Sequence, residues 1–444
     1  MAKLIISGGD IVTMNSGREQ IVGGHIVVED GLISAVGSGP LAADPGAVVI
    51  DASGCVVTPG LINAHQHFTG DPLVASCIPD TITSDEAIFD WAVPIHEQHS
   101  PDDDEVAATL TAVQCLRTGT TTAVEAGTVA YPDRVAAGMN AAGIRATLGR
   151  WGWDVPDVPY GGSVDKVLAL QRELVAAWPA GGRVEGWVTL VGHALASDEL
   201  LAGAAALSRE LGVNMTMHMS PTPGDSVEYR ERSGLSAIEH LASLDVLGPN
   251  LLVGHAVHLE DAELDLLLEH DVAIAYCPWA YLRLGQGVSR AGRHAEFVER
   301  GGRLALGADA ANAGDHRDLL STAALTAGLA RDTGHDQFGS ANALAHATVE
   351  GARAVGVADR IGSLEVGKAA DIVVFDATGL DWGARGDLTM QLVWGNVGST
   401  VRDVVVDGEI VIRDRVSTRV DEPALVAEAR ERKASLLRRA GITP

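Results

Sequence analysis

Short apolar runs broken by glycine and aspartate turns occupy both ends of the chain. The first 55 residues alternate such runs with turns, as in "KLIISGGDIVTM" and "IVVEDGLISAVG", and the same style returns in "DIVVFD" and "VRDVVVDGEIVIRD" near the C-terminus. Apolar runs bounded by turn residues are typical of strands and hairpins. We therefore predict one small β-sandwich built from both termini, with parts at residues 1–57 and 361–420.

Between these parts, buried-looking apolar runs alternate with amphipathic stretches such as "DAELDLLLEH", which are typical of helices. Eight strands are predicted, at residues 57–65, 118–127, 144–154, 184–194, 213–220, 250–257, 271–278 and 303–310. Eight strand–helix units favour an α/β fold with a closed (β/α)8 TIM barrel over residues 58–360. A doubly wound open sheet is the competitor, but it normally carries a glycine-rich nucleotide turn, and none is found. Residues 421–444 predict an exposed C-terminal helix.

Polar residues end several of the predicted strands. Histidines end the first, fourth, fifth and sixth strands and an aspartate ends the eighth, at His65 and His67, His193, His218, His255 and Asp309. The C-terminal ends of TIM-barrel strands meet at the active-site face, and residues i and i+2 of a strand point the same way. Each histidine taken alone is more often a hydrogen-bonded loop residue. Their repeated position favours convergence on one metal ion.

The chemistry of such a set is hydrolytic. Three neutral imidazoles and one carboxylate suit one divalent ion, Zn²⁺ before Fe²⁺, Mn²⁺ or Co²⁺, and leave a position for a water whose pKa the metal lowers. Asp309 could bind the metal and accept the water's proton. His255 would orient the hydroxide or polarise the bond under attack, and His193 would face the substrate.

The chain resembles the amidohydrolase superfamily, in the branch of cyclic aminohydrolases and related metal-dependent hydrolases. The resemblance spans nearly the whole chain and lies in "VIDASGCVVTPGLINAHQH", "LRTGTTT", "VGHALASDEL", "HMS", "GHAVHL", "YCPWAYLRLGQG", "LALGADAANAGD" and "IGSLEVGKAADIVVFD". It implies a barrel with a split β-sandwich. It matches the metal ligands of the family to His65, His67, His218 and Asp309. It also matches His193 to the substrate histidine after strand four, and His255 to the histidine of strand six. The chain has no lysine at a predicted barrel-strand end for a carboxylated bridge, so one metal is expected; its lysines are Lys3, Lys166, Lys368 and Lys433.

One departure from this branch concerns the reaction. Its deaminases typically place a proton-shuttling glutamate three residues after the strand-five histidine, where "HMSPTPGD" has Pro221. Asp225 or Glu125 could substitute, although each is more often an ordinary solvated carboxylate. We therefore predict cleavage of a C–N bond of amide, urea or carbamate type, by attack of a metal-bound hydroxide on a small N-containing or aromatic molecule. A deaminase of a heterocycle or amidine is the alternative, and a metal-binding scaffold is disfavoured because the whole ligand set is present.

Two further features refine the expected substrate: three sequence stretches and the aromatic residues near the predicted site. The stretches are "QHFTGDPL", "CIPD" and "WAVPIHE". The stretches loosely resemble hydrolases of N-substituted ureas and thiocarbamates. Aromatic residues are only 4% of the chain, yet five lie in loops or just beyond strand ends: Phe68, Trp91, Trp153, Trp279 and Tyr281. Each alone is more often core packing, but together they predict a pocket for a flat or apolar substrate.

Composition limits partners and compartment. The 444 residues suit a barrel plus a smaller domain. A formal net charge of −27 repels nucleic acid and anionic membranes, so a small-molecule substrate is expected and neither of those partners. No apolar stretch reaches the roughly 18 residues of a membrane span, and no N-terminal signal is evident. Four cysteines without paired spacing favour the cytoplasm, and we expect a homo-oligomer.

Overall fold

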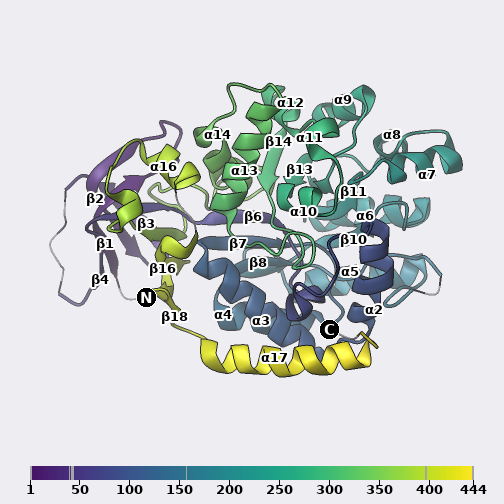
Figure 1. Ribbon diagram of the computed structural model, residues 1–444, viewed down its shortest axis with the longest axis horizontal. Helices are drawn as coiled ribbons and strands as arrows, with labels where there is room; N and C mark the ends of the chain where they lie inside the picture. The colour runs from purple at the N-terminus through teal and green to yellow at the C-terminus, as the bar shows by residue number, and fades with distance from the viewer. Residues whose placement is uncertain (1–2, 40, 42–44, 157, 396–397, 443–444) are drawn as a thin grey trace.

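The computed structural model describes residues 3–39, 41, 45–156, 158–395 and 398–442. The outermost residues of the predicted first and last segments, 1–2 and 443–444, lie outside this range. Figure 1 shows a barrel ringed by helices and, at the left, a small sheet in which strands from both ends of the chain lie side by side. The predicted pairing of a TIM barrel with a β domain from both termini is confirmed.

Parallel strands form the barrel, and nearly all of their residues are buried. They are β6 Leu61–Gln66, β7 Thr120–Glu125, β8 Arg145–Leu148, β9 Val184–Gly186, β10 Val188–Gly192, β11 Met215–Met219, β12 Leu251–His255, β13 Ala273–Tyr276 and β14 Arg303–Leu306. Strands β6 to β9 pair in one sheet and β10 to β14 in another. Only Trp187 separates β9 from β10, so the two make one barrel strand. Continuous apolar runs form such strands because both faces are covered.

The barrel closes between its first and last strands. Gln66 pairs in parallel with Asp309, and the Asp309 N–H donates to the carbonyl of His65 at 2.8 Å. The third strand is shorter than the predicted 144–154, because the chain leaves the sheet after Leu148 and carries Trp151 and Trp153 over the end of the barrel.

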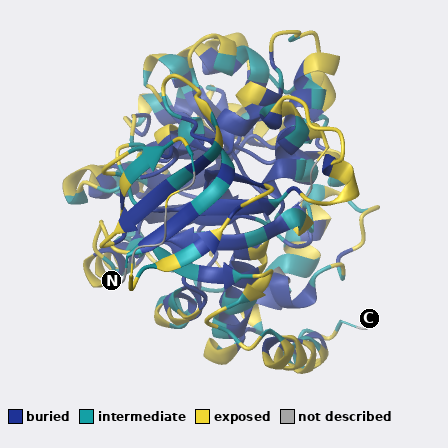
Figure 2. Cartoon of the chain, turned by 90° about the vertical axis from the view of Figure 1, so that its left-hand side faces the viewer, coloured by how far each residue is buried: buried dark blue, intermediate teal, exposed yellow. Residues whose placement is uncertain are grey.

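Helices surround the barrel. Figure 2 looks onto the side of the small domain and shows mostly buried strands at the centre and helices with exposed outer faces at the periphery. The helices after β6 are η1 Asp71–Val74, α1 Ser84–Glu86, η2 Ala87–Ala92, α2 Val93–Glu97, α3 Pro101–Arg117, α4 Pro132–Ala142, α5 Val164–Ala177, α6 Asp198–Leu211, α7 Gly224–Ser233, α8 Ala237–Ser243, α9 Asp261–Glu269, α10 Pro278–Arg283, α11 Val288–Ala291, α12 His294–Glu299, α13 Leu319–Asp332, α14 Ser340–His346, α15 Val349–Ala354, η3 Leu380–Trp382, α16 Leu388–Trp394, η4 Gly398–Thr400 and α17 Glu422–Arg439. Serine caps begin α3, α5 and α6, as their sequences favour. None of the described helices is long and apolar enough to cross a membrane.

Over its described residues, the small domain forms one nine-stranded sheet with its own apolar core. Its strands are β1 Leu4–Val12, β2 Gln20–Glu29, β3 Leu32–Gly37, β4 Val48–Asp51, β5 Cys55–Pro59, β15 Ile372–Asp376, β16 Val401–Val406, β17 Glu409–Arg413 and β18 Val416–Ser417. The two ends of the chain meet where β5 pairs antiparallel with β15. Strand β5 runs directly into β6, so the small sheet fixes the strand that leads to His65 and His67.

A segment between β6 and α3, residues 71–99, folds over the C-terminal end of the barrel; we call it the cap segment. Side-chain hydrogen bonds fix it at two places. Asn312 accepts hydrogen bonds from the backbone N–H groups of Cys77 and Ile78 at 3.0 and 3.2 Å. His99 donates to the carbonyl of Gly70 at 3.0 Å, and its other ring nitrogen lies 2.8 Å from Asp104.

A buried ion pair joins the barrel to the small domain. Arg145 of β8 donates two hydrogen bonds to Asp371, which precedes β15, at 3.0 and 3.1 Å. Both side chains are at most 7% exposed. Burial alone would lower the pKa of Arg145, but the carboxylates of Asp371 and Asp407 raise it, so the guanidinium stays charged.

We expect Arg145→Met to lower the free energy of unfolding by about 3–5 kcal/mol, because it leaves the buried carboxylate of Asp371 without its partner. Urea unfolding measures this loss. The matched control is Arg172→Met, which breaks the exposed pair with Glu210 and should change stability little. Equal, small losses in both variants would contradict the structural role of the Arg145 pair.

Candidate functional site

Six polar side chains from the ends of five barrel strands meet at the C-terminal end of the barrel, at the positions that the sequence indicated. They are His65, His67, His193, His218, His255 and Asp309. One Asp309 oxygen lies 3.5 Å from His67 Nε2 and 3.7 Å from His65 Nε2. The Nε2 atoms of His67 and His218 are 3.3 Å apart. The ring of His193 stacks on that of His218 at 5.6 Å.

The donor atoms of this cluster fit a divalent cation. Both ring nitrogens of His65 and Nδ1 of His255 are buried without a hydrogen-bond partner among the described residues. Buried polar atoms are rarely left unpaired, since each costs free energy. The ligand atoms of His65, His67 and Asp309 lie within 4.8 Å of one another, as do those of His65, His218 and His255. Nitrogen and carboxylate donors at this spacing suit zinc and similar ions.

The protonation states agree with this fit. Burial lowers the pKa of His65 well below its usual value and that of His218 to about 3, so both imidazoles are neutral, as metal binding requires. Burial would raise the pKa of Asp309, but the surrounding histidines hold it below its usual value, so this carboxylate is ionised.

A second layer of contacts orients the rings. His218 Nδ1 donates to the carbonyl of Val191 at 2.7 Å, and His67 Nδ1 lies 2.8 Å from the Thr128 hydroxyl. Each contact occupies Nδ1 and leaves Nε2 to face the centre of the cluster. Such outer partners fix the orientation and tautomer of a ligating histidine.

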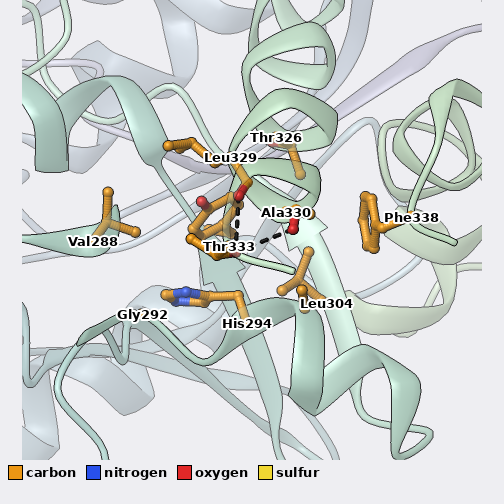
Figure 3. Close-up of a pocket in the computed structure, with 11 residues that line it drawn as sticks. Val288, Gly292, His294, Leu304, Thr326, Leu329, Ala330, Thr333 and Phe338 are labelled. Carbon is orange, nitrogen blue, oxygen red and sulfur yellow. Dashed lines mark hydrogen bonds between the residues drawn. The ribbon is translucent and has the colours of Figure 1, made fainter. Parts of the chain in front are cut away.

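His255 is held in a strained conformation. Its φ is +80° and that of Ala256 is +50°, in the left-handed region that most residues avoid. His294 Nε2 donates to the carbonyl of His255 at 2.7 Å, and the Tyr276 ring packs on the His294 ring at 4.2 Å. Figure 3 shows His294 beside the small apolar cavity that it lines with Val288 and Leu304. Strain of this kind persists only where surrounding contacts impose it.

His193 has a carboxylate partner that the sequence did not assign to it. Asp225 accepts from His193 Nδ1 at 2.9 Å and from the Ser220 N–H at 2.6 Å. Burial would lower the pKa of His193, but the Asp225 carboxylate outweighs it and raises the pKa. His193 also accepts, through its carbonyl, a 2.7 Å hydrogen bond from the Tyr229 hydroxyl.

Pro221, at the position where the sequence departs from the deaminase pattern, lines the cavity above this cluster. Of the two substitutes considered from the sequence, Asp225 lines the cavity and Glu125 does not. The Glu125 carboxylate is fully buried and accepts from the N–H groups of Gly127 and Thr128 at 2.7 and 3.4 Å. The Glu125 carboxylate therefore stabilises the turn at residues 125–128 and does not face the cavity.

The cavity has a volume of about 320 Å³. Of the five aromatic residues predicted for its wall, Trp153 lines it and four do not. Phe68 is fully buried in the core, and Trp279 stacks on His316 at 5.2 Å. Tyr281 is buried behind His255, with ring centroids 5.6 Å apart, and Trp91 lies on η2 of the cap segment. Position beyond a strand does not fix the direction of a side chain, and these four lie outside the described lining of the cavity.

Other residues take that place in the wall. Sequence reasoning missed Trp151, although the "GRWGWD" stretch places it two residues before Trp153, and it missed several cap-segment residues: Ile78, Ile88, Phe89, Val93 and His96. It also missed Cys277, whose sulfur lies within 4.8 Å of ligand atoms of His255 and Asp309. Burial raises the pKa of the Cys277 thiol well above its usual value, so it remains protonated in this setting.

The chain matches the model of the amidohydrolase family over residues 56–411. It therefore belongs to that family, as its motifs indicated, and is a hydrolase of carbon–nitrogen bonds. The family is metal-dependent, which agrees with the histidine and aspartate cluster at the end of the barrel.

Similar proteins include deaminases and a triazine hydrolase. The chain is 29% identical to 5'-deoxyadenosine deaminase of Methanosarcina mazei, over 99% of both chains. It is also 29% identical to S-triazine hydrolase of Gordonia rubripertincta, over 100% of this chain and 98% of the relative. Among solved structures, an adenosine deaminase from Xanthomonas campestris with bound zinc has a TM-score of 0.90 and 26% identity, covering 98% of each chain. The zinc complex of atrazine chlorohydrolase from Arthrobacter aurescens, 22% identical with a TM-score of 0.88, covers 98% of this chain and 100% of that one and shares the fold.

Proposed function

We propose that this chain hydrolyses the C–N bond of a small amide, urea or carbamate that carries an apolar body. One observation supports this choice over ring deamination. Pro221 lines the cavity where a shuttling glutamate would stand, and the nearby carboxylate of Asp225 already accepts hydrogen bonds from His193 and Ser220. The leaving amine must then take its proton from another group.

In this proposal His65, His67, His218 and Asp309 hold one divalent ion, with Zn²⁺ the best match to the donors. The zinc bound in the Xanthomonas campestris adenosine deaminase supports that choice. A divalent ion held there supplies a nucleophilic water at neutral pH and polarises the bond under attack.

The chain's own residues move the protons and hold the substrate. The attacking water's oxygen bonds to the carbonyl carbon, and Asp309 accepts the proton that it releases. His255, whose Nδ1 lies 3.9 Å from Asp309, faces the developing oxyanion. As the C–N bond breaks, that proton passes from Asp309 to the leaving nitrogen. His193, held by Asp225, hydrogen-bonds the substrate from the other side of the barrel.

Deamination of a heterocycle or amidine is the second candidate. The deaminases among the similar proteins favour it, and the His193–Asp225 pair in the cavity offers a replacement proton relay. The two candidates differ in their products on N-substituted substrates, because deamination of a ring releases ammonia whereas cleavage of an N-substituted amide, urea or carbamate releases the substituted amine.

The compartment and assembly are part of the same proposal. All four cysteines are free, and Cys55, Cys115 and Cys277 are buried. Unpaired thiols of this kind fit a reducing cytoplasm, and we propose a cytoplasmic homo-oligomer that takes neither nucleic acid nor membrane as a partner. Light scattering on the purified protein measures its mass in solution.

Metal content tests the ligand assignment. We expect His218→Ala to reduce bound zinc from about one ion per chain to near none and to abolish turnover, because it removes one of four donors. His255→Ala should retain the metal and lose turnover. His335→Ala, whose ring pairs with Glu299 away from the cluster, is the control. Retention of zinc and activity by His218→Ala would remove His218 from the ligand set.

His294 should act as a positioning residue for His255. We expect His294→Phe to lower kcat by up to about 10²-fold while KM and metal content change little, because the carbonyl of His255 loses its donor and the ring shifts. His294→Gln, which carries an amide N–H at similar reach, should recover part of the loss. Full activity of His294→Phe would show that the strained backbone needs no such support.

A paired assay on the zinc-loaded wild-type protein distinguishes the two reactions. We expect substituted amine to be released from anilides, ureas or carbamates, and little ammonia from aminated rings such as adenosine. Loss of a positioned acid–base group costs about 10²–10⁴-fold, so a deaminase that needs glutamate at this position would be crippled. Pro221→Glu should not speed amide cleavage; the same change at the exposed Pro223, outside the cavity, is its control. Efficient release of ammonia from a ring would put the deaminase first.

A further inference from the structure

The cavity wall has an uneven charge distribution. Among its described lining residues there is no lysine or arginine, whereas four are acidic: Asp85, Asp225, Glu228 and Asp309. Asp85 and Glu228 are exposed at the rim, and the other two are buried near the histidine cluster. A ligand therefore meets carboxylates both at the entrance and at the base.

The part of the wall away from the histidines is apolar and aromatic. The indoles of Trp151 and Trp153 stack on each other at 4.8 Å with their planes 26° apart. The cap segment adds aliphatic and aromatic side chains, which are Ile78, Ile88, Phe89 and Val93. Indole rings and aliphatic side chains favour contact with flat, apolar groups.

The lining also contains neutral polar side chains, which are Ser84, Thr128, Thr222, Gln286 and Asn312, and a histidine beside the indoles. His96 is 7% exposed and lines the cavity, with its ring edge-on to Trp151 at 5.1 Å. Burial lowers the pKa of His96 well below its usual value, so the imidazole is neutral. No hydrogen bond to its ring nitrogens occurs within the described part of the chain. It offers a single donor and a single acceptor to an uncharged polar atom.

We propose that the substrate body beyond the C–N bond is flat, apolar and free of negative charge, and that the cavity rejects anions at its far end. The inference rests on the proposed function only for the end at which the scissile bond lies. A carboxylate at the far end would lose its hydration and find no cation, while Asp85 and Glu228 repel it during entry. A carboxylate at the reacting end could instead reach the metal, so the charge must be tested at the far end.

The test compares para-tolylurea with its para-carboxyphenyl counterpart on zinc-loaded protein. The two differ in charge only at the position remote from the urea. Isothermal titration calorimetry should give at least about 10²-fold tighter binding of the neutral compound, the discrimination expected when a charge is buried unpaired. Ile88→Arg places a cation in the far wall and should narrow that ratio. Val22→Arg, at an exposed position of β2 in the small domain, adds the same charge outside the cavity lining and should leave this ratio unchanged.

Binding and turnover separate the two proposals. Equal or tighter binding of the carboxylate by the wild-type protein, or measurable binding of neither compound, would overturn the inference about charge. The inference would also be overturned if Val22→Arg reduced the ratio of the two dissociation constants as much as Ile88→Arg does. The effect would then come from the net charge of the protein and not from the cavity wall. Neutral preference in binding without release of amine from any amide, urea or carbamate would leave this inference standing and overturn the proposed reaction.

Discussion

The buried histidine and aspartate side chains at the end of the barrel share one requirement, which is a positive charge that can pair with all of them. This requirement organises the centre of the protein. Neutral imidazoles and an ionised carboxylate project from the ends of several barrel strands onto one point, and several of the ring nitrogens are buried without a hydrogen-bond partner among the described residues. Burying such groups is costly unless something pairs with all of them. A divalent cation held at that point would pair with all of them, and the ends of the barrel strands bring the donor atoms together there.

The surrounding structure holds this arrangement against its own strain. His193, His255 and Asp309 all have positive φ values at the ends of their strands. Each is restrained by hydrogen bonds that do not involve the ring nitrogens or carboxylate oxygens facing the centre of the cluster. Asp225 and Tyr229 hold His193, His294 holds the carbonyl of His255, and the backbone of Asp309 is tied to β6. The small domain contributes by continuing β5 into β6, so both ends of the chain help to fix the first two histidines.

The reaction and the substrate are decided in different layers of the site. The histidine cluster is suited to hydrolysis in general, as the breadth of similar proteins indicates, from a nucleoside deaminase to a triazine hydrolase. The loop after β11 bears on which proton transfers are available, because it presents Pro221 and directs Asp225 to His193. The cap segment and the indoles of Trp151 and Trp153 affect which substrates fit the cavity, because they form an apolar wall with acidic groups at its rim.

The sequence by itself determined the barrel, the split small domain and the six polar residues that meet at its end. Those features follow from local periodicity and from the rule that parallel strands present their C-terminal ends on one face, so position along each strand was enough. It did not determine which aromatic residues form the wall, since Phe68 and Tyr281 turn into the core while Trp151 and Phe89 face the cavity. Nor did it assign Asp225 to His193 or His294 to His255. These contacts join residues 32 and 39 positions apart, and only the packing of loops and helices across the barrel decides them.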